Sequence, residues 1–218
     1  MTERATLASL RRMKRDGRKI VGVVAWDTPT ARILDRAGVD IVSVGDSVGV
    51  NLWGREHEGD VTLDELALLC TAVRRGARRA VVSCDLPEPS IDAAQRLLEA
   101  GADVVKVERS AGELAAAGVP VFAQLDGASG DAGTLVAEAE RLEAAGAELI
   151  DFRHSGAEAG SRVVEAVAIP VLGGLGGGPW LDGRMRLLRR LVDVEPAVED
   201  AVAAYAEDVR AGRPVRGD

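Results

Sequence analysis

The sequence predicts an α/β fold, a (β/α)8 barrel of the TIM type. Short apolar runs recur at 41–46, 80–85 and 103–108, and such runs are typical of parallel strands buried on both faces. Segments with helical spacing alternate with these runs, which indicates βαβ units. The chain has 218 residues and 47% hydrophobic content, enough for one core and near the short end for this fold.

The elements follow one another in the order that a barrel needs. A helix over 7–15 precedes the first strand. Four later helices end in Ala-Gly, where the glycine can adopt the positive φ that terminates a helix; these pairs are 37–38, 100–101, 117–118 and 145–146. Seven strands are expected near residues 20, 41, 80, 103, 120, 149 and 170.

The end of the chain is less regular. An eighth strand is expected near 185–191, and arginines interrupt its apolar pattern. A helix over about 197–210 follows. Since no linker or low-complexity block interrupts the chain, a single domain is expected over 1–218, with an N-terminal and a C-terminal helix added to the barrel. The alternative is an open doubly wound sheet, but no glycine-rich dinucleotide fingerprint follows the first strand.

Composition limits the classes of function. The formal net charge of −8 argues against a general nucleic-acid or membrane-surface binder. No apolar segment is long enough to span a bilayer, and the first residues lack the apolar core of a signal peptide. Cys70 and Cys84 form no CxxC pair, so both thiols are expected to be free. A cytoplasmic protein is expected.

Three carboxylates stand where predicted strands end. Asp46, Asp85 and Glu108 close the three apolar runs, and alternation places Asp46 on the same strand face as Val42 and Val44. Because the carboxyl ends of barrel strands form one rim, the acids are expected to converge there. Carboxylates about 5 Å apart repel by roughly 3 kcal/mol per pair, which a hard cation such as Mg2+ would offset. The alternative is that they cap helices or pair with arginines.

One lysine interrupts an apolar run. Lys106 is one of three lysines in a chain rich in arginine. Alternation puts it on the same strand face as Glu108, whereas Val105 and Val107 face the other way. The valines suit the helix layer, so Lys106 and Glu108 are expected in the barrel interior and at its mouth, with Lys106 beside the three acids.

Several segments resemble the ketopantoate hydroxymethyltransferase family, within the phosphoenolpyruvate mutase/isocitrate lyase-like barrels. The resemblance extends over nearly the whole chain, and its most specific part combines VGDS with VTLDE. It rests chiefly on WDTPTA at 26–31, VGDS at 44–47, VTLDE at 61–65, CDLP at 84–87 and VKVE at 105–108.

The resemblance implies a site and a reaction. It implies a Mg2+ held by Asp46, Asp85 and, directly or through water, Glu108. An α-keto acid would chelate this ion, and Ser47 and Lys106 would hold its carboxylate. The enolate would then take a one-carbon unit from 5,10-methylenetetrahydrofolate, a step of pantothenate biosynthesis. The resemblance also implies a homo-oligomer.

The sequence departs from the family pattern at the positions expected to accept the proton and to bind the substrate. The glutamate thought to act as the base is replaced by Arg153, which cannot accept a proton at neutral pH. Asp151 and His154 are the neighbouring candidates for proton transfer, and Arg153 suits a second anionic group. Gln124 stands where the family has the histidine of a Gly-His pair, and it becomes a candidate substrate ligand.

These departures leave three hypotheses. The first is Mg2+-dependent hydroxymethyl transfer to an α-keto acid. The second keeps the metal and the enolate but carries out a lyase, aldolase or mutase reaction on a dianionic keto acid. The third is a non-catalytic paralogue. In the first two the partner is a small molecule, with no nucleic acid and no membrane.

Overall fold

The computed structural model describes residues 4–214, which divide into two compact units. One unit comprises the described residues up to Arg186 and contains the barrel. The other begins at Leu187 and contains the last helix. That the whole chain forms one domain, as the sequence predicts, stays a prediction. No helix in the described range has the length and apolar character needed to cross a bilayer.

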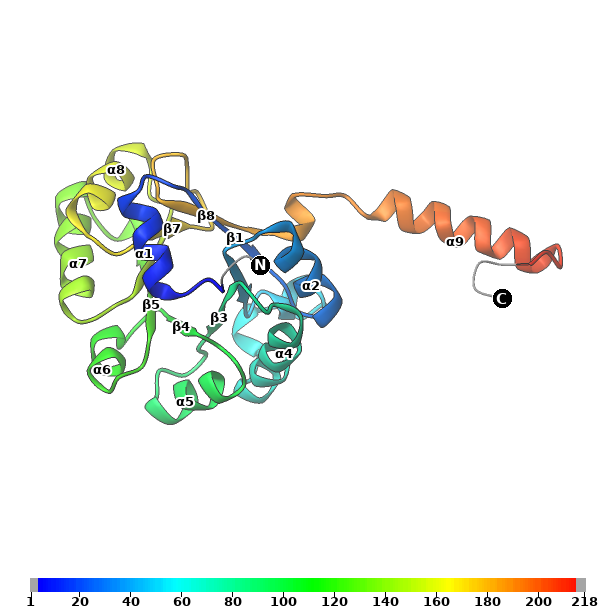
Figure 1. The fold of residues 1–218 in the computed structure, drawn as a ribbon, viewed down its shortest axis with the longest axis horizontal. Helices are drawn as coiled ribbons and strands as arrows, with labels where there is room; N and C mark the ends of the chain where they lie inside the picture. Colours follow the sequence, from blue (N-terminus) through cyan, green and yellow to red (C-terminus); the bar gives the residue numbers. More distant parts are fainter. Residues whose placement is uncertain (1–3, 215–218) are drawn as a thin grey trace. The chain divides into compact units, whose positions relative to one another are not determined.

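Strands and helices alternate along the barrel unit (Figure 1). The strands are β1 (Ile20–Val24), β2 (Ile41–Val44), β3 (Val81–Asp85), β4 (Val104–Val107), β5 (Val121–Asp126), β6 (Leu149–Arg153), β7 (Val171–Gly173) and β8 (Gly183–Leu187). The helices are α1 (Leu7–Arg15), α2 (Thr28–Ala37), α3 (Val48–Asn51), α4 (Leu63–Gly76), α5 (Ile91–Glu99), α6 (Ala111–Ala116), α7 (Ala132–Ala144) and α8 (Ala157–Ala166).

The eight strands form a closed parallel barrel, which confirms the predicted fold class. All their carboxyl ends therefore lie at the same rim. The register aligns Ser43 with Ser83, Asp85 with Lys106, and Gln124 with Asp151. The site discussed below is built at this rim, where β3 to β6 lie next to one another.

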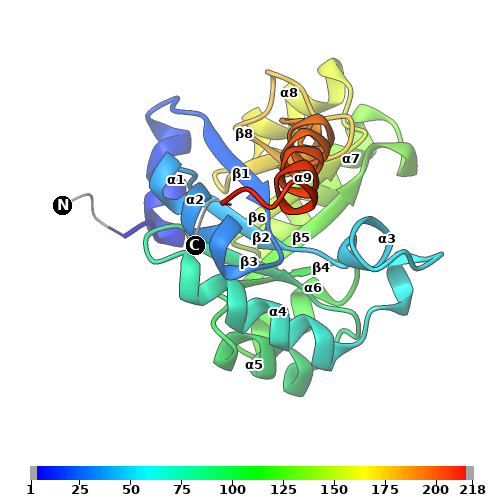
Figure 2. The same ribbon diagram turned by 90° about the vertical axis from the view of Figure 1, so that its right-hand side faces the viewer.

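The barrel interior is apolar at its amino-terminal end. One large side chain from each strand contributes to it, and Leu10 and Met13 of α1 pack against this cluster. Figures 1 and 2 show α1 across one end of the barrel, while α3 lies at the opposite end. The helix closes the barrel at the amino-terminal end. The strand members are Ile20, Ile41, Val81, Val104, Phe122, Leu149, Leu172 and Met185.

Local sequence explains where the helices begin and end. Side chains of Asp27, Ser90 and Asp131 accept backbone N–H groups at the starts of α2, α5 and α7. The predicted glycine stops are confirmed, with φ between 81° and 113°. They are Gly38, Gly101, Gly118 and Gly146.

The eighth strand begins earlier than predicted. It spans Gly183–Leu187, and a 3-10 turn occupies residues 188–190. Met185 joins the interior cluster, and alternation therefore turns Arg184 and Arg186 to the other face. Arg184 and Arg186 interrupt the apolar pattern of the strand because they face away from the barrel interior. The C-terminal unit contains α9 (Glu195–Arg210), close to the predicted helix.

Candidate active site at the strand ends

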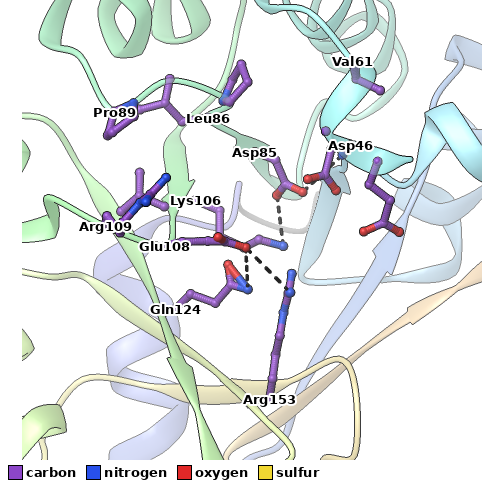
Figure 3. Close-up of a pocket in the computed structure, with 14 residues that line it drawn as sticks. Asp46, Val61, Asp85, Leu86, Pro89, Lys106, Glu108, Arg109, Gln124 and Arg153 are labelled. Atoms are coloured by element: carbon purple, nitrogen blue, oxygen red, sulfur yellow. Dashed lines mark hydrogen bonds and ion pairs between the residues drawn. The ribbon is translucent and has the colours of Figure 1, made fainter. Parts of the chain in front are cut away.

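A pocket of about 300 Å3 lies at the carboxyl ends of the strands (Figure 3). We call it the inner pocket. Side chains from β3, β4, β5 and β6 and from the segments that follow β2 and β3 meet here. It is lined by Asp46, Glu58, Gly59, Val61, Asp85, Leu86, Pro87, Pro89, Lys106, Val107, Glu108, Arg109, Gln124 and Arg153.

Asp46 and Asp85 lie together on one side of the pocket (Figure 3). The Asp46 amide donates to Asp85 Oδ2 at 3.2 Å, and Asp85 is buried, with 7% of its surface exposed. Burial, and then the charge and hydrogen bond of Asp85, raise the pKa of Asp46 to about 7. The two carboxylates are therefore unfavourable as an isolated pair of anions, and a proton or a cation would stabilise them.

The prediction that strand alternation directs Asp46 into the pocket, on the same face as Val42 and Val44, is wrong. In β2 it is Ile41 and Ser43 that face the interior, because Ile41 joins the interior cluster and Ser83 Oγ donates to Ser43 Oγ at 2.9 Å. Asp46 lies beyond the strand, which ends at Val44, so alternation no longer applies to it. The turn at Gly45 brings it in. A Cβ at Gly45 would lie 3.1 Å from Ser47 Oγ and 3.3 Å from Asp85 Oδ2, so even alanine would require these side chains to shift slightly.

Lys106 lies in the interior beside acidic side chains, as predicted. Its Nζ is 3.0 Å from Asp85 Oδ1 and 3.6 Å from Asp151 Oδ2, and 10% of the side chain is exposed. Burial alone would lower its pKa, but Asp85 and Asp151 outweigh that effect and raise the pKa above the ordinary lysine value. The Lys106 side chain is therefore positively charged at neutral pH. Asp85 Oδ1 forms an ion pair with Lys106, but the angles between the two groups are not those of a hydrogen bond.

Glu108, Gln124 and Arg153 form the opposite side of the pocket (Figure 3). Arg153 Nη1 lies 3.9 Å from Glu108 Oε1. With the amide oriented to satisfy both groups, the Gln124 side-chain oxygen accepts from the Arg153 guanidinium at 2.6–2.8 Å. The guanidinium is one-quarter exposed, so it can meet a ligand in the pocket.

Asp151 lies behind this group, is 3% exposed and, like His154, is not among the residues that line the inner pocket. Its Oδ2 is 3.7 Å from Arg153 Nε, whereas its Oδ1 has no hydrogen-bond partner among the described residues. A buried carboxylate oxygen in this state has a free lone pair that a proton could occupy.

The two remaining candidates lie at the edge of the site. His154 adopts a positive φ of 50°, and its Nδ1 lies 3.2 Å from Asp126 Oδ1, away from the lining of the inner pocket. Ser47 is half-buried at the start of α3. Its Oγ would lie 3.1 Å from a Cβ at Gly45, on the same side as Asp85.

Only two of the three predicted metal ligands, Asp46 and Asp85, lie in contact with each other. Within residues 4–214, no three His, Cys, Asp or Glu side chains have the geometry of a metal cluster. Asp46 and Asp85 lie in contact, while the Glu108 side chain is 69% exposed and lies 3.9 Å from Arg153. Two carboxylates nonetheless suit Mg2+, which retains several waters and takes ligands from its substrate. The donor chemistry of Asp46 and Asp85 therefore fits Mg2+, and the part played by Glu108 stays a prediction.

Sequence reasoning overlooked three polar residues. Glu58 and Arg109 line the inner pocket, and Asp126 orients His154 at its edge. The other acids were predicted because each ends an apolar strand, and the same criterion applies to Asp126, the last residue of β5. Glu58 lies in a 3-10 turn far from any strand end, where no pattern indicates its position.

Solved structures share this architecture. The chain aligns with 2,3-dimethylmalate lyase at a TM-score of 0.71 and 15% identity, covering 100% of this chain and 92% of the other. Phosphonopyruvate hydrolase, solved in complex with oxalate and Mg2+, aligns at a TM-score of 0.71 and 14% identity, covering 98% and 90%. At these identities the likeness shows the fold.

Sequence comparison identifies the family. A model of ketopantoate hydroxymethyltransferase matches residues 4–130. The 3-methyl-2-oxobutanoate hydroxymethyltransferase of Alkalilimnicola ehrlichii is 33% identical, covering 95% of this chain and 91% of the relative. That of Nitrosococcus oceani is 34% identical, covering 88% and 84%. The chain therefore belongs to the ketopantoate hydroxymethyltransferase family, a family of transferases.

Proposed function

We propose that this enzyme converts a 2-oxo acid to its enolate in a Mg2+-dependent reaction and adds a hydroxymethyl group from 5,10-methylenetetrahydrofolate. The observation that carries the proposal is the Asp46–Asp85 pair directly above Lys106. Two carboxylates in contact favour a dication, and the nearby ammonium favours the carboxylate of a substrate. Family membership supports the same chemistry.

The chain's own residues have distinct tasks in this proposal. Asp46 and Asp85 would hold Mg2+, which when bound would polarise the keto group and acidify the neighbouring C–H. Lys106 offsets the negative charge that develops on the substrate as the proton leaves. Ser47 lies on the same side as Asp85, where its hydroxyl can bind the substrate carboxylate.

The proton needs an acceptor other than Arg153. We assign this task to Asp151, because its buried Oδ1 has no hydrogen-bond partner among the described residues. Its neighbours Lys106 and Arg153 then lie beside the group that gains and loses the proton. His154 is the competing candidate, and it faces Asp126.

Solvent exchange tests the enolate step without the one-carbon donor. Wild-type protein with Mg2+ is expected to exchange the C–H next to the keto group of 3-methyl-2-oxobutanoate with D2O, followed by NMR, and to lose this activity in EDTA. Asp151→Asn should lower the exchange rate at least about 100-fold, in the range typical of a general base. His154→Asn should leave it within a few-fold. The reverse pattern would assign the base to His154.

Metal binding is tested separately. Asp85→Ala is expected to abolish Mg2+ binding in calorimetry while circular dichroism stays unchanged, and Asp85→Asn checks this result with a side chain of the same shape. The matched control is Asp92→Ala, an exposed residue of α5. Full Mg2+ affinity in the Asp85 variants would refute the site. Tight binding without exchange by wild type would favour the non-catalytic hypothesis.

Arg153 supports a second candidate function, a lyase or mutase reaction on a dianionic 2-oxo acid. Its guanidinium faces the inner pocket and contacts a neutral amide more closely than any carboxylate, so it could bind a second anionic group. The test compares kcat/KM for oxaloacetate-like and phosphonopyruvate-like compounds with that for 3-methyl-2-oxobutanoate. Preference for the dianions, lost in Arg153→Gln, would establish this candidate; no turnover of any dianion would eliminate it.

A further inference from the structure

The loop that joins α3 to α4, residues 52–62, forms one wall of the inner pocket. Glu58, Gly59 and Val61 contribute to this wall. A 3-10 turn begins at Glu58, which is exposed, and the proposed function assigns no task to this residue. A carboxylate in the wall of a pocket that binds a cation can act on that cation.

The loop is fixed beside the turn that carries Asp46. The Gly49 amide donates to the Asp46 carbonyl at 2.9 Å, so the two residues lie within one turn of the chain. A Cβ at Gly49 would lie 2.8 Å from Val61 Cγ2 and 3.5 Å from the His57 carbonyl oxygen. The loop therefore packs directly on α3 at this glycine, through residues on either side of Glu58.

Arg55 attaches this loop at several points. Its backbone N–H donates to the Gly49 carbonyl at 2.9 Å, and its Nη1 donates to the Asp60 carbonyl at 2.6 Å and to Glu65 Oε2 at 3.0 Å. Because Glu65 belongs to the capping box of α4, the loop is tied to a fixed helix end. These contacts limit the movement of Glu58, which lies between Arg55 and Asp60 in the chain.

The pocket wall near Asp46 carries several negative charges. Asp46 and Asp85 lie in contact; burial and Asp85 raise the pKa of Asp46 most, and the charge of Glu58 raises it further. Lys106 lies 3.0 Å from Asp85 Oδ1, yet this buried oxygen has no hydrogen-bond partner among the described residues. A loop that holds a third carboxylate near such a pair adds repulsion, which a bound dication would replace with attraction.

Glu108, which the family pattern offers as the third acid, lies on the opposite side of the inner pocket (Figure 3). Its side chain is 69% exposed and lies 3.9 Å from Arg153 Nη1. This guanidinium offsets the charge of Glu108 and competes with a cation for it. Among residues 4–214, no Lys, Arg or His side chain forms an ion pair with Glu58. Glu58 is therefore the less neutralised of the two glutamates.

We propose that Glu58, positioned by Arg55, is a further residue of the cation site and takes the place predicted for Glu108. No three acids in the described part of the chain have the geometry of direct ligands, so the Glu58 carboxylate accepts hydrogen bonds from water on the ion. Mg2+ retains several such waters in proteins. The inference rests on the proposed function, because it requires a cation at Asp46 and Asp85.

Calorimetry with Mg2+ in the absence of substrate tests the inference. Glu58→Gln removes the charge and keeps the shape, and it is expected to raise the Kd for Mg2+ about tenfold or more, as is typical of residues that support a metal site from outside its direct ligands. Glu108→Gln should raise this Kd less than threefold. The matched control is Glu56→Gln, because Glu56 is an exposed glutamate of the same loop outside the inner pocket. It should bind Mg2+ as wild type does.

A double-mutant cycle tests the task of Arg55. Arg55→Met alone should raise the Kd for Mg2+ at least about fivefold, because the loop loses its attachments. Combined with Glu58→Gln, it should raise the Kd less than twofold further, since the carboxylate that it positions is already neutral. Urea midpoints show whether each variant is folded. Equal losses in both backgrounds would overturn the positioning role of Arg55.

The outcomes separate the inference from the function on which it rests. If wild type binds Mg2+ and Glu58→Gln binds it with an unchanged Kd, the inference is wrong and the proposed function stands. A larger loss in Glu108→Gln than in Glu58→Gln would also overturn it, since Glu108 would then be the third acid. If wild type neither binds Mg2+ nor catalyses exchange in its presence, the proposed function fails, and the inference fails with it.

Discussion

At the residue scale, the site depends on Lys106. This ammonium is buried between Asp85 of the adjacent strand β3 and Asp151 of β6, which lies two strands away from β4. A buried charge that loses its partner costs several kcal/mol, so the three groups are coupled. Their spacing follows from the barrel register, which aligns Asp85 with Lys106 directly.

Lys106→Ala is expected to weaken keto-acid binding about tenfold or more, because a charge-assisted contact contributes roughly 1.5–3 kcal/mol. The Kd for Mg2+ should not rise, since Lys106 competes with the cation for Asp85. Calorimetry with each ligand measures both values. Lys19→Ala is the control, because Lys19 donates to the Leu181 carbonyl outside the site. Equal losses for the two ligands would indicate a purely structural lysine.

At the element scale, the segment before α4 is stabilised by charge. Thr62 and Glu65 form a capping box at the start of α4, and Arg55 forms an ion pair with Glu65. The guanidinium of Arg55 stacks on Trp53, 4.8 Å from the ring centroid. These contacts attach the loop after α3 to α4. Glu58 and Gly59 of the inner pocket lie within the same loop.

The charge of Glu65 predicts a pH dependence of stability. Its hydrogen bonds from Arg55, and then from Thr62, lower its pKa from 4.5 to about 2. A depressed carboxyl pKa stabilises the folded state above pH 4.5, and that contribution is lost as the pH falls toward 2. Urea midpoints of wild type should exceed those of Glu65→Gln at pH 7, and the difference should shrink below pH 4.5. Glu140→Gln on α7 is the control; a difference that persists at pH 2 would contradict the expectation.

Much of the barrel follows from local patterns. Apolar runs and glycine stops predicted the seven earlier strands because each signal lies within a few residues of its element. The face of Asp46 was predicted wrongly, since its position depends on a turn and not on strand alternation. The proximity of Glu108 to Arg153 could not be predicted, because Arg153 belongs to another strand. Contacts between distant segments leave no periodic signal.

At the scale of the whole molecule, α9 carries one apolar face. Residues 187–214 leave its large side chains uncovered, with exposed fractions of 52–58% for Val198, Val202, Tyr205 and Val209. These residues recur every three or four positions and so share one helix face. A helix of this length gains most of its stability from packing. We propose that this face packs against a second copy of the chain, in line with the expected homo-oligomer.

Charges on this face should disrupt the assembly. Wild type is expected to be an oligomer by light scattering, and Val198→Glu with Val202→Glu should reduce its mass to that of one chain. Glu199→Gln with Asp200→Asn is the control, since these neighbours are also on α9. A monomeric wild type would refute the proposal.

The ion pair between Lys106 and Asp85 has a thermodynamic consequence for how the binding of one ligand affects the binding of the other. When the ammonium leaves Asp85 it loses its counter-charge, and an incoming substrate carboxylate replaces that charge. A cation at Asp85 and an anion at Lys106 therefore assist each other, and linkage requires this assistance to be equal in both directions. The protein should consequently favour joint occupancy over occupancy by either ligand alone.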